Sequence, residues 1–195
     1  MTIRGTMAAA VVLMGCCAMG AQAQMGEDTP PVPLGQKVEP SKALDEMVRM
    51  FEHEVTGVAE AMPADKYSFS PANGAMAGAK FNGVRTFAQQ VTHIASANYY
   101  FASAVSGQKP DVDMKALNAK TSKEDCLKAL ADSFVVVHQA VATITPANAF
   151  ESIQGADGLH TRVEVAAFIS AHGFDHYGQM VEYLRMNGIV PPGSK

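Results

Sequence analysis

The chain has 195 residues, of which 48% are hydrophobic and 17% are charged, and its formal net charge is −4. This composition fits one globular domain with a real core and argues against intrinsic disorder. The negative charge, with no long run of Lys or Arg, leaves no basic surface for a nucleic-acid partner. Ala and Met are abundant, and the alternating pattern of β-strands is scarce, so the composition favours helices.

The first 23 residues have the organisation of a secretory signal peptide. A single charge at Arg4 precedes an apolar run over residues 7–19, and Ala21-Gln22-Ala23 follows. Small residues at −3 and −1 mark a cleavage site, and the apolar run is too short for a stable membrane span. We therefore predict residues 1–23 as a signal peptide and an exported protein, either periplasmic or secreted.

The three cysteines raise two questions, which are lipid attachment at the N-terminus and disulfide formation. Residues 13–16 (LMGC) loosely match a lipoprotein box, which would attach a lipid to Cys16, but cleavage after Ala23 is favoured because methionine is atypical in such a box. Cys16 and Cys17 then leave with the signal peptide, and Cys126 can form no internal disulfide. Its position in a helical apolar pattern indicates a buried residue rather than a catalytic thiol.

Residues 24–40 contain four prolines and are predicted to be an extended tether. Residues 41–195 then form the predicted domain. Four stretches in it have the three-four spacing of amphipathic helices. These run from an N-cap at Ser41 to Pro63, from Val84 to Ser106, from an N-cap at Ser122 to Ile144, and from Arg162 to Asn187. Four such helices with long connections predict an all-α four-helix bundle.

Three connections separate the predicted helices, and those between the first and second and between the third and fourth are long. Residues 63–83 form the longest of them, and a connection of this length often covers a functional site. Tyr67, Phe69 and Phe81 are predicted to hold it against the bundle. Residues 107–121 and 147–159 form the other two connections.

Two histidines lie on the apolar side of the last predicted helix. His172 and His176 are four residues apart, so both imidazoles are expected to point toward the core. Burying an unpaired imidazole costs on the order of 1–3 kcal/mol, so both rings need partners. A divalent metal is one solution, and hydrogen bonds to other side chains are the other.

The remaining histidines give weaker signals. His93 lies nearly opposite the centre of the apolar stripe of its helix, so it can face a core only if that helix is buried on two sides. His138 lies at the flank of a stripe and is interpreted as a boundary residue with a hydrogen-bond partner. His53 lies off the apolar stripe and is predicted to be solvated.

Several known chemistries lack their motif in this sequence. There is no Gly-rich phosphate loop, no Gly-x-Ser-x-Gly elbow and no paired-cysteine zinc site. Gly173 occupies the position that glutamate has in the His-Glu-x-x-His motif of zinc proteases, so that route to peptide hydrolysis has no base. The paired Glu-x-x-His motifs of di-iron bundles are also absent.

Three stretches together resemble the DinB-like (YfiT/DinB) family of bacterial proteins. They are residues 66–71 (KYSFSP) with 84–88 (VRTFA), residues 93–101 (HIASANYYF) and residues 172–192. The resemblance extends from about Leu44 to Pro192. It implies an up-down-down-up four-helix bundle in which His93, His172 and His176 bind a divalent metal, nickel or zinc. The second face of the helix carrying His93 would then point toward the metal.

The resemblance also implies a function. Some members transfer or isomerise with low-molecular-weight thiols such as bacillithiol or mycothiol, and homodimers are common among them. Three neutral imidazoles leave an open position on the metal, which is typical of catalytic sites. We therefore expect a metal-dependent transferase of the thiol type, or a hydrolase, acting on an unknown small molecule.

Two alternatives stay open at this point. Export separates the protein from a cytosolic thiol pool, which argues against a thiol substrate. One alternative is a non-catalytic exported bundle that binds a metal or small ligand, for example in a stress response. In a third interpretation the histidines are hydrogen-bonded and metal-free. The polar groups to inspect near the site are Asn98, Tyr100, His138 and Tyr177.

Overall fold

The computed structural model describes residues 32–73 and 78–194. The predicted signal peptide, the lipoprotein box and the first part of the tether lie outside these residues. The regular structure of the described part is helical, which confirms the all-α prediction. It comprises α1 (Pro40–Ala61), η1 (Ala64–Lys66), η2 (Pro71–Asn73), α2 (Phe87–Ser106), α3 (Met114–Asn118), α4 (Lys123–Ala142), α5 (Arg162–Met186) and η3 (Pro192–Ser194).

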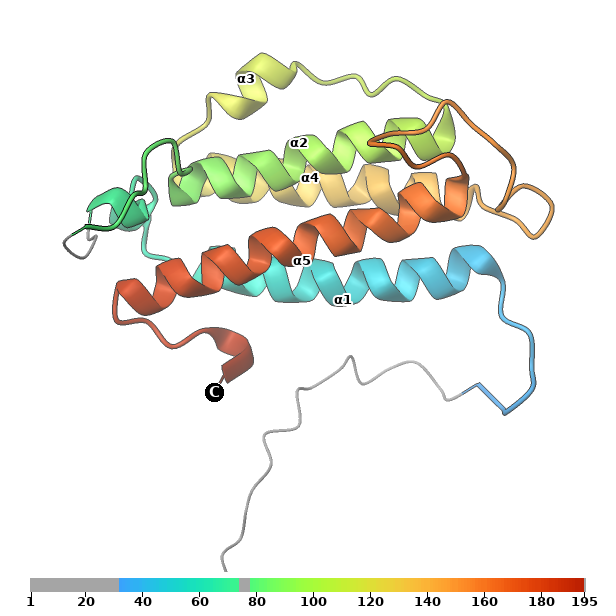
Figure 1. Ribbon diagram of the computed structural model, residues 1–195, viewed down its shortest axis with the longest axis horizontal. Coiled ribbons are helices and arrows are strands. Elements are labelled where there is room, and N and C mark those ends of the chain that lie inside the picture. Colours follow the sequence, from blue (N-terminus) through green and yellow to red (C-terminus); the bar gives the residue numbers. More distant parts are fainter. Residues whose placement is uncertain (1–31, 74–77, 195) are drawn as a thin grey trace, which may run out of the picture.

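The four long helices form a bundle with the predicted up-down-down-up order. Figure 1 shows α1 and α5 running in one direction and α2 and α4 running in the other. Helix α1 packs against α4 and α5, and α2 packs against the same two helices. Within the described ranges, no helix is both long and apolar enough to cross a membrane.

Side-chain caps determine where the helices begin. Thr86 accepts a hydrogen bond from the backbone of Gln89, whose side chain bonds back to Thr86, and this capping box starts α2 at Phe87. The prediction that this helix begins at Val84 was therefore wrong by three residues. Thr161 and Glu164 form the same device at the start of α5, where the predicted start is confirmed.

Two other boundaries differ from the predictions. Helix α1 begins at Pro40 rather than after Ser41, because proline is well suited to the first helical turn. The connection over residues 107–121 contains the short helix α3, which the sequence did not reveal. The Asp113 side chain caps it by accepting hydrogen bonds from two backbone amides.

The long connection between α1 and α2 is held to the bundle as predicted. Tyr67 is buried, and its hydroxyl donates to the carbonyl of Ala59 at 2.8 Å. The half-buried Phe69 packs against the core, and its carbonyl accepts from the amide of Phe87 at 2.8 Å. Phe81 is half-buried and is absent from the described core cluster, so two of the three predicted anchors are confirmed.

Helix α5 uses two faces. Gly173 faces α1, where a Cβ would lie 2.1 Å from the ring of Phe51, so only glycine allows this approach. Tyr177 extends the same contact, since its hydroxyl donates to Glu54 on α1 at 2.9 Å. His176 points instead toward Gln90 on α2. The structure therefore separates a packing face of α5 from a polar face directed at α2.

Candidate metal centre

Three histidines from two neighbouring helices converge at one point. His93 comes from α2, while His172 and His176 come from α5, and one nitrogen of each lies within 4.8 Å of the others. We call these three residues the histidine cluster. The Nε2 atoms of His172 and His176 are 3.2 Å apart. Metal–imidazole bonds of about 2.0–2.1 Å place tetrahedral ligand atoms about 3.3–3.4 Å apart, so this spacing suits a shared metal.

The histidine cluster is closed on one side and open on the other. His176 is only 6% exposed, whereas His93 and His172 are half-buried. The ring of His93 packs against that of His176 with centroids 4.5 Å apart, and Phe101 packs against His172 at 5.5 Å. Solvent therefore reaches the cluster at His93 and His172.

Burial keeps the cluster uncharged at neutral pH. It lowers the pKa of His93 and of His176 to about 4, and the neighbouring positive charge of Arg85 acts in the same direction on both. Burial also lowers the pKa of His172, although the nearby Asp175 and Asp157 oppose it. At pH 7 each ring is neutral and carries one free lone pair, which is the form of imidazole that binds metals.

Two glutamine side chains support His176. Its Nδ1 lies 2.9 Å from Oε1 of Gln90, and Gln90 continues to Gln179 on α5. Gln90 is 1% exposed and bridges the two helices that carry the cluster. The sequence analysis missed both glutamines. The available signal was their spacing, because one lies three residues before His93 and the other three residues after His176.

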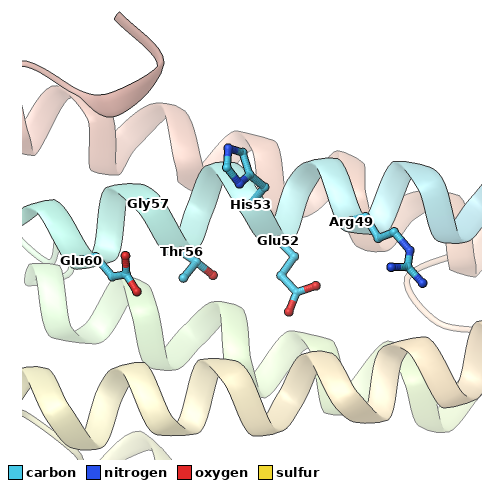
Figure 2. Close-up of a pocket in the computed structure, with 6 residues that line it drawn as sticks. All are labelled: Arg49, Glu52, His53, Thr56, Gly57 and Glu60. Carbon is cyan, nitrogen blue, oxygen red and sulfur yellow. The ribbon is translucent and has the colours of Figure 1, made fainter. Parts of the chain in front are cut away.

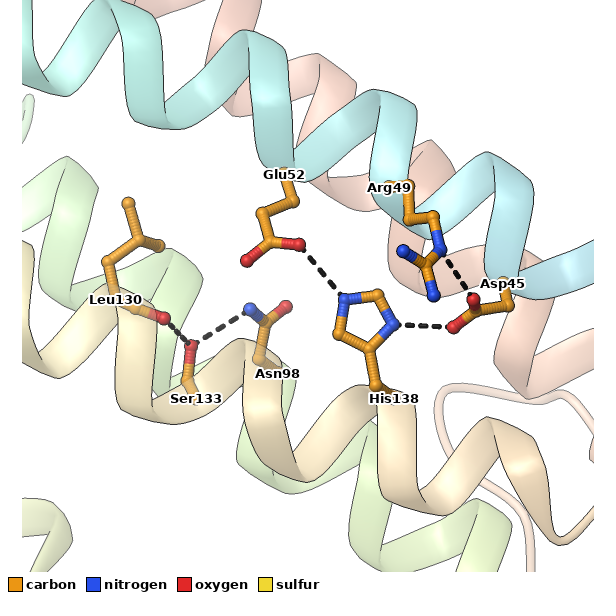
Figure 3. Close-up of polar contacts among 7 residues, drawn as sticks. All are labelled: Asp45, Arg49, Glu52, Asn98, Leu130, Ser133 and His138. Carbon is orange, nitrogen blue, oxygen red and sulfur yellow. Dashed lines mark hydrogen bonds and ion pairs between the residues drawn. The ribbon is translucent and has the colours of Figure 1, made fainter. Parts of the chain in front are cut away.

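The polar groups expected near the site have other roles. Figure 3 shows Asn98 donating to Ser133 on α4, at 3.0 Å. Tyr177 donates to Glu54 on α1, and Tyr100 is 50% exposed with no hydrogen bond from its hydroxyl among the described residues. Asn98 and Tyr177 therefore serve the packing between helices rather than the histidine cluster.

His138 lies between two carboxylates, as Figure 3 shows. Its Nδ1 bonds Asp45, and its Nε2 bonds Glu52 at 2.9 Å. We call Asp45, Glu52 and His138 the carboxylate clamp. Burial lowers the pKa of His138, but the hydrogen bonds to Glu52 and Asp45 outweigh it and leave the pKa raised. The prediction of a boundary histidine with hydrogen-bond partners is confirmed.

Two further predictions concern isolated residues. His53 is exposed, as predicted, and it lines a shallow groove of about 370 Å³ whose six lining residues all belong to α1 (Figure 2). No residue of the histidine cluster lines this groove. Cys126 is buried, as predicted, and burial raises the pKa of its thiol to about 11, which disfavours the reactive thiolate.

Comparison with known proteins identifies the family. The model of the DinB superfamily matches residues 28–180, which include all three residues of the histidine cluster. No curated protein matches the chain. The match covers well over half of the sequence and agrees with the helical bundle. The chain belongs to the DinB superfamily.

Proposed function

We propose that this protein binds one divalent metal ion through the histidine cluster, with nickel or zinc as the favoured ions. The observation that carries the proposal is the convergence of three neutral imidazoles within 4.8 Å on two adjacent helices. Imidazole is a good ligand for both metals. A metal-free cluster explains less, because the described residues offer the His93 ring no hydrogen bond and offer the His172 ring only the one to Nε2 of His176.

The bound metal would supply a Lewis acid with an open position, able to deprotonate a thiol or water or to polarise an electrophile. The protein's own contribution is positional. Gln90 orients His176, Phe101 covers one side of His172, and the half-buried His93 and His172 leave an approach for a small molecule. This arrangement supports a metal-dependent transferase of the thiol type, or a hydrolase.

A non-catalytic metal- or ligand-binding bundle is the second candidate. It is favoured by the hydrogen bonds of Asn98, Tyr177 and His138, which commit these groups to the packing of the bundle. An assay of the metal-loaded protein distinguishes the two candidates. Turnover of a small thiol with an electrophilic acceptor, or of an activated ester, above the rate with free metal supports an enzyme, whereas equal rates support a binding protein.

Metal analysis of the purified protein tests the site itself. We expect about one nickel or zinc ion per chain in the natural protein and almost none in His172→Ala, because two imidazoles hold the ion less well than three. His160→Ala is the matched control, since His160 is exposed and lies outside the cluster. Equal metal content in His172→Ala and the natural protein would contradict the proposal.

We also propose export, supported by the apolar run and the Ala21-Gln22-Ala23 motif at the N-terminus. The mass of the protein recovered from outside the cytoplasm tests the cleavage position, and we expect a mature chain that begins at Gln24. A lipid-modified Cys16 at the N-terminus would contradict it. The family resemblance supports a homodimer, which light scattering of the mature protein would measure.

A further inference from the structure

A chain of hydrogen bonds leads from the surface of α5 to the histidine cluster. The Asp175 carboxylate accepts from Nε2 of Gln179 at 3.0 Å. Oε1 of Gln179 accepts from Nε2 of Gln90 at 2.8 Å. Oε1 of Gln90 lies 2.9 Å from Nδ1 of His176. Four side chains from two helices therefore form one continuous series that ends on a predicted ligand.

The chemistry of the four groups gives this series one direction. An ionised carboxylate only accepts hydrogen bonds, so Gln179 has to direct its NH₂ group at Asp175 and its oxygen at Gln90. Gln90 then directs its NH₂ group at Gln179 and its oxygen at His176. An amide oxygen cannot donate, so Nδ1 of His176 carries the proton.

We propose that Asp175, acting through Gln179 and Gln90, holds His176 in the Nδ1–H tautomer. The unprotonated nitrogen is then Nε2, the atom that faces Nε2 of His172 at 3.2 Å. Asp175, Gln179 and Gln90 are positioning residues. The role of Nε2 as a metal ligand rests on the proposed function, but the tautomer itself does not.

Burial explains why the arrangement is stable. Gln90 is 1% exposed, so both ends of its amide need a partner inside the protein, and Gln179 and His176 supply them. Gln179 is half-buried, and Asp175 is exposed at the surface end. A buried glutamine that merely joined α2 to α5 would need no charged end, whereas the carboxylate here determines the orientation of both amides.

Histidine ¹⁵N NMR of the metal-free protein at pH 7 reads the tautomer directly. We expect His176 to show a protonated Nδ1. In Asp175→Lys the surface end can only donate, which reverses both amides and shifts His176 toward the Nε2–H form. The matched control is Glu182→Lys, which makes the same charge change at an exposed position of α5 that bonds only Arg185.

The outcomes separate the two proposals. An Nε2–H tautomer in the natural protein, or a tautomer that is the same in Asp175→Lys and Glu182→Lys, overturns the positioning role whether or not metal binds. Zinc titration gives a second readout: Gln90→Leu is expected to weaken zinc affinity 10- to 100-fold, as is usual when a metal ligand loses the hydrogen-bond partner that orients it. Natural affinity in this variant overturns the positioning role, whereas failure of the natural protein to bind zinc or nickel overturns only the proposed function.

Discussion

The described part of the chain holds buried or half-buried histidines in two regions, and the neighbours of these histidines have opposite effects on their pKa. In the histidine cluster, between α2 and α5, the hydrogen-bond partners of His176 are an amide and another imidazole. In the carboxylate clamp, between α1 and α4, His138 contacts Asp45 and Glu52. Burial lowers the pKa of the histidine in both places, but only the clamp has carboxylates bonded to the ring to reverse the effect.

This difference determines what each region can do. A neutral imidazole has a lone pair for a metal, whereas a protonated one has none. The cluster is therefore suited to metal binding, and the clamp to joining α1 to α4 by charge. The lesson is that the neighbours of a histidine, rather than its burial, decide between a ligand and an electrostatic contact.

The largest effect is expected when one histidine of each region is replaced and the zinc affinity of the two variants is compared. His176→Ala removes one of the three proposed ligands, so we expect zinc affinity to fall on the order of 100-fold or more, beyond the usual loss for a residue that only orients a ligand. His138→Ala should leave the affinity unchanged, because no residue of the clamp belongs to the cluster. Calorimetric titration of both variants measures the contrast, and a similar loss in both would show that the clamp takes part in binding.

Gly173→Ala is expected to lower the stability of the fold without changing zinc binding at the histidine cluster. The new Cβ would lie 2.1 Å from the Phe51 ring, so the α1–α5 contact has to open. Overpacking of this kind costs about 1–3 kcal/mol in free energy of unfolding. Chemical denaturation should show this loss, while zinc affinity stays within a few-fold because His176 is directed at Gln90 on α2 and not at Phe51. Gly178→Ala is the control, since no atom lies within 4 Å of a Cβ there.

Much of the fold was predictable because it depends on local patterns. The three-four spacing identified the four long helices and placed the start of α5 at Arg162, where the structure shows the capping box of Thr161 and Glu164. The start of α2 was missed because Val84 fits the apolar stripe, whereas the capping box at Thr86 determines the boundary. Helix α3 was missed because five residues are too few for a periodicity to be visible.

The candidate site was less accessible to sequence reasoning. His172 and His176 were found by their spacing, but His93 lies off the main stripe of its helix and was added only through the family resemblance. Its position became meaningful once α2 was seen to pack against both α4 and α5. Gln90 and Asp45 contact histidines 86 and 93 residues away, and no pattern along the chain contains such pairings.

Acid should destabilise the metal-free protein through the cluster. The pKa of His93 is about 4 in the folded protein against 6.5 in the unfolded chain, so the unfolded chain binds more protons between these values. Stability therefore falls as the pH decreases from 6.5 to 4. Between pH 7 and pH 5, the free energy of unfolding of His93→Gln should fall by about 1 kcal/mol less than that of the natural protein, after allowing for solvent screening. Urea denaturation with a chelator present measures this, and an unchanged pH dependence in His93→Gln would contradict it.

The contribution of His138 in the carboxylate clamp to stability should change with pH in the opposite direction, and by a smaller amount. Its raised pKa means that the contribution of His138 to stability is complete below pH 6.5 and is lost as the pH rises through the folded value. The pKa of Asp45 is lowered, because its hydrogen bonds to His138 and Arg49 outweigh the effect of burial, so its contribution is lost as the pH falls through that value.

His138→Gln tests this slope. The variant should be less stable than the natural protein by about 0.5 kcal/mol at pH 6, because partly exposed ion pairs contribute little. The deficit should shrink as the pH rises, when His138 of the natural protein loses its charge. His53→Gln is the control, since it makes the same substitution at an exposed histidine of α1 that lies outside the carboxylate clamp. A deficit for His138→Gln that stays constant with pH would mean that the ring contributes by packing and not by charge, and the contrast between the two regions would then be one of geometry alone.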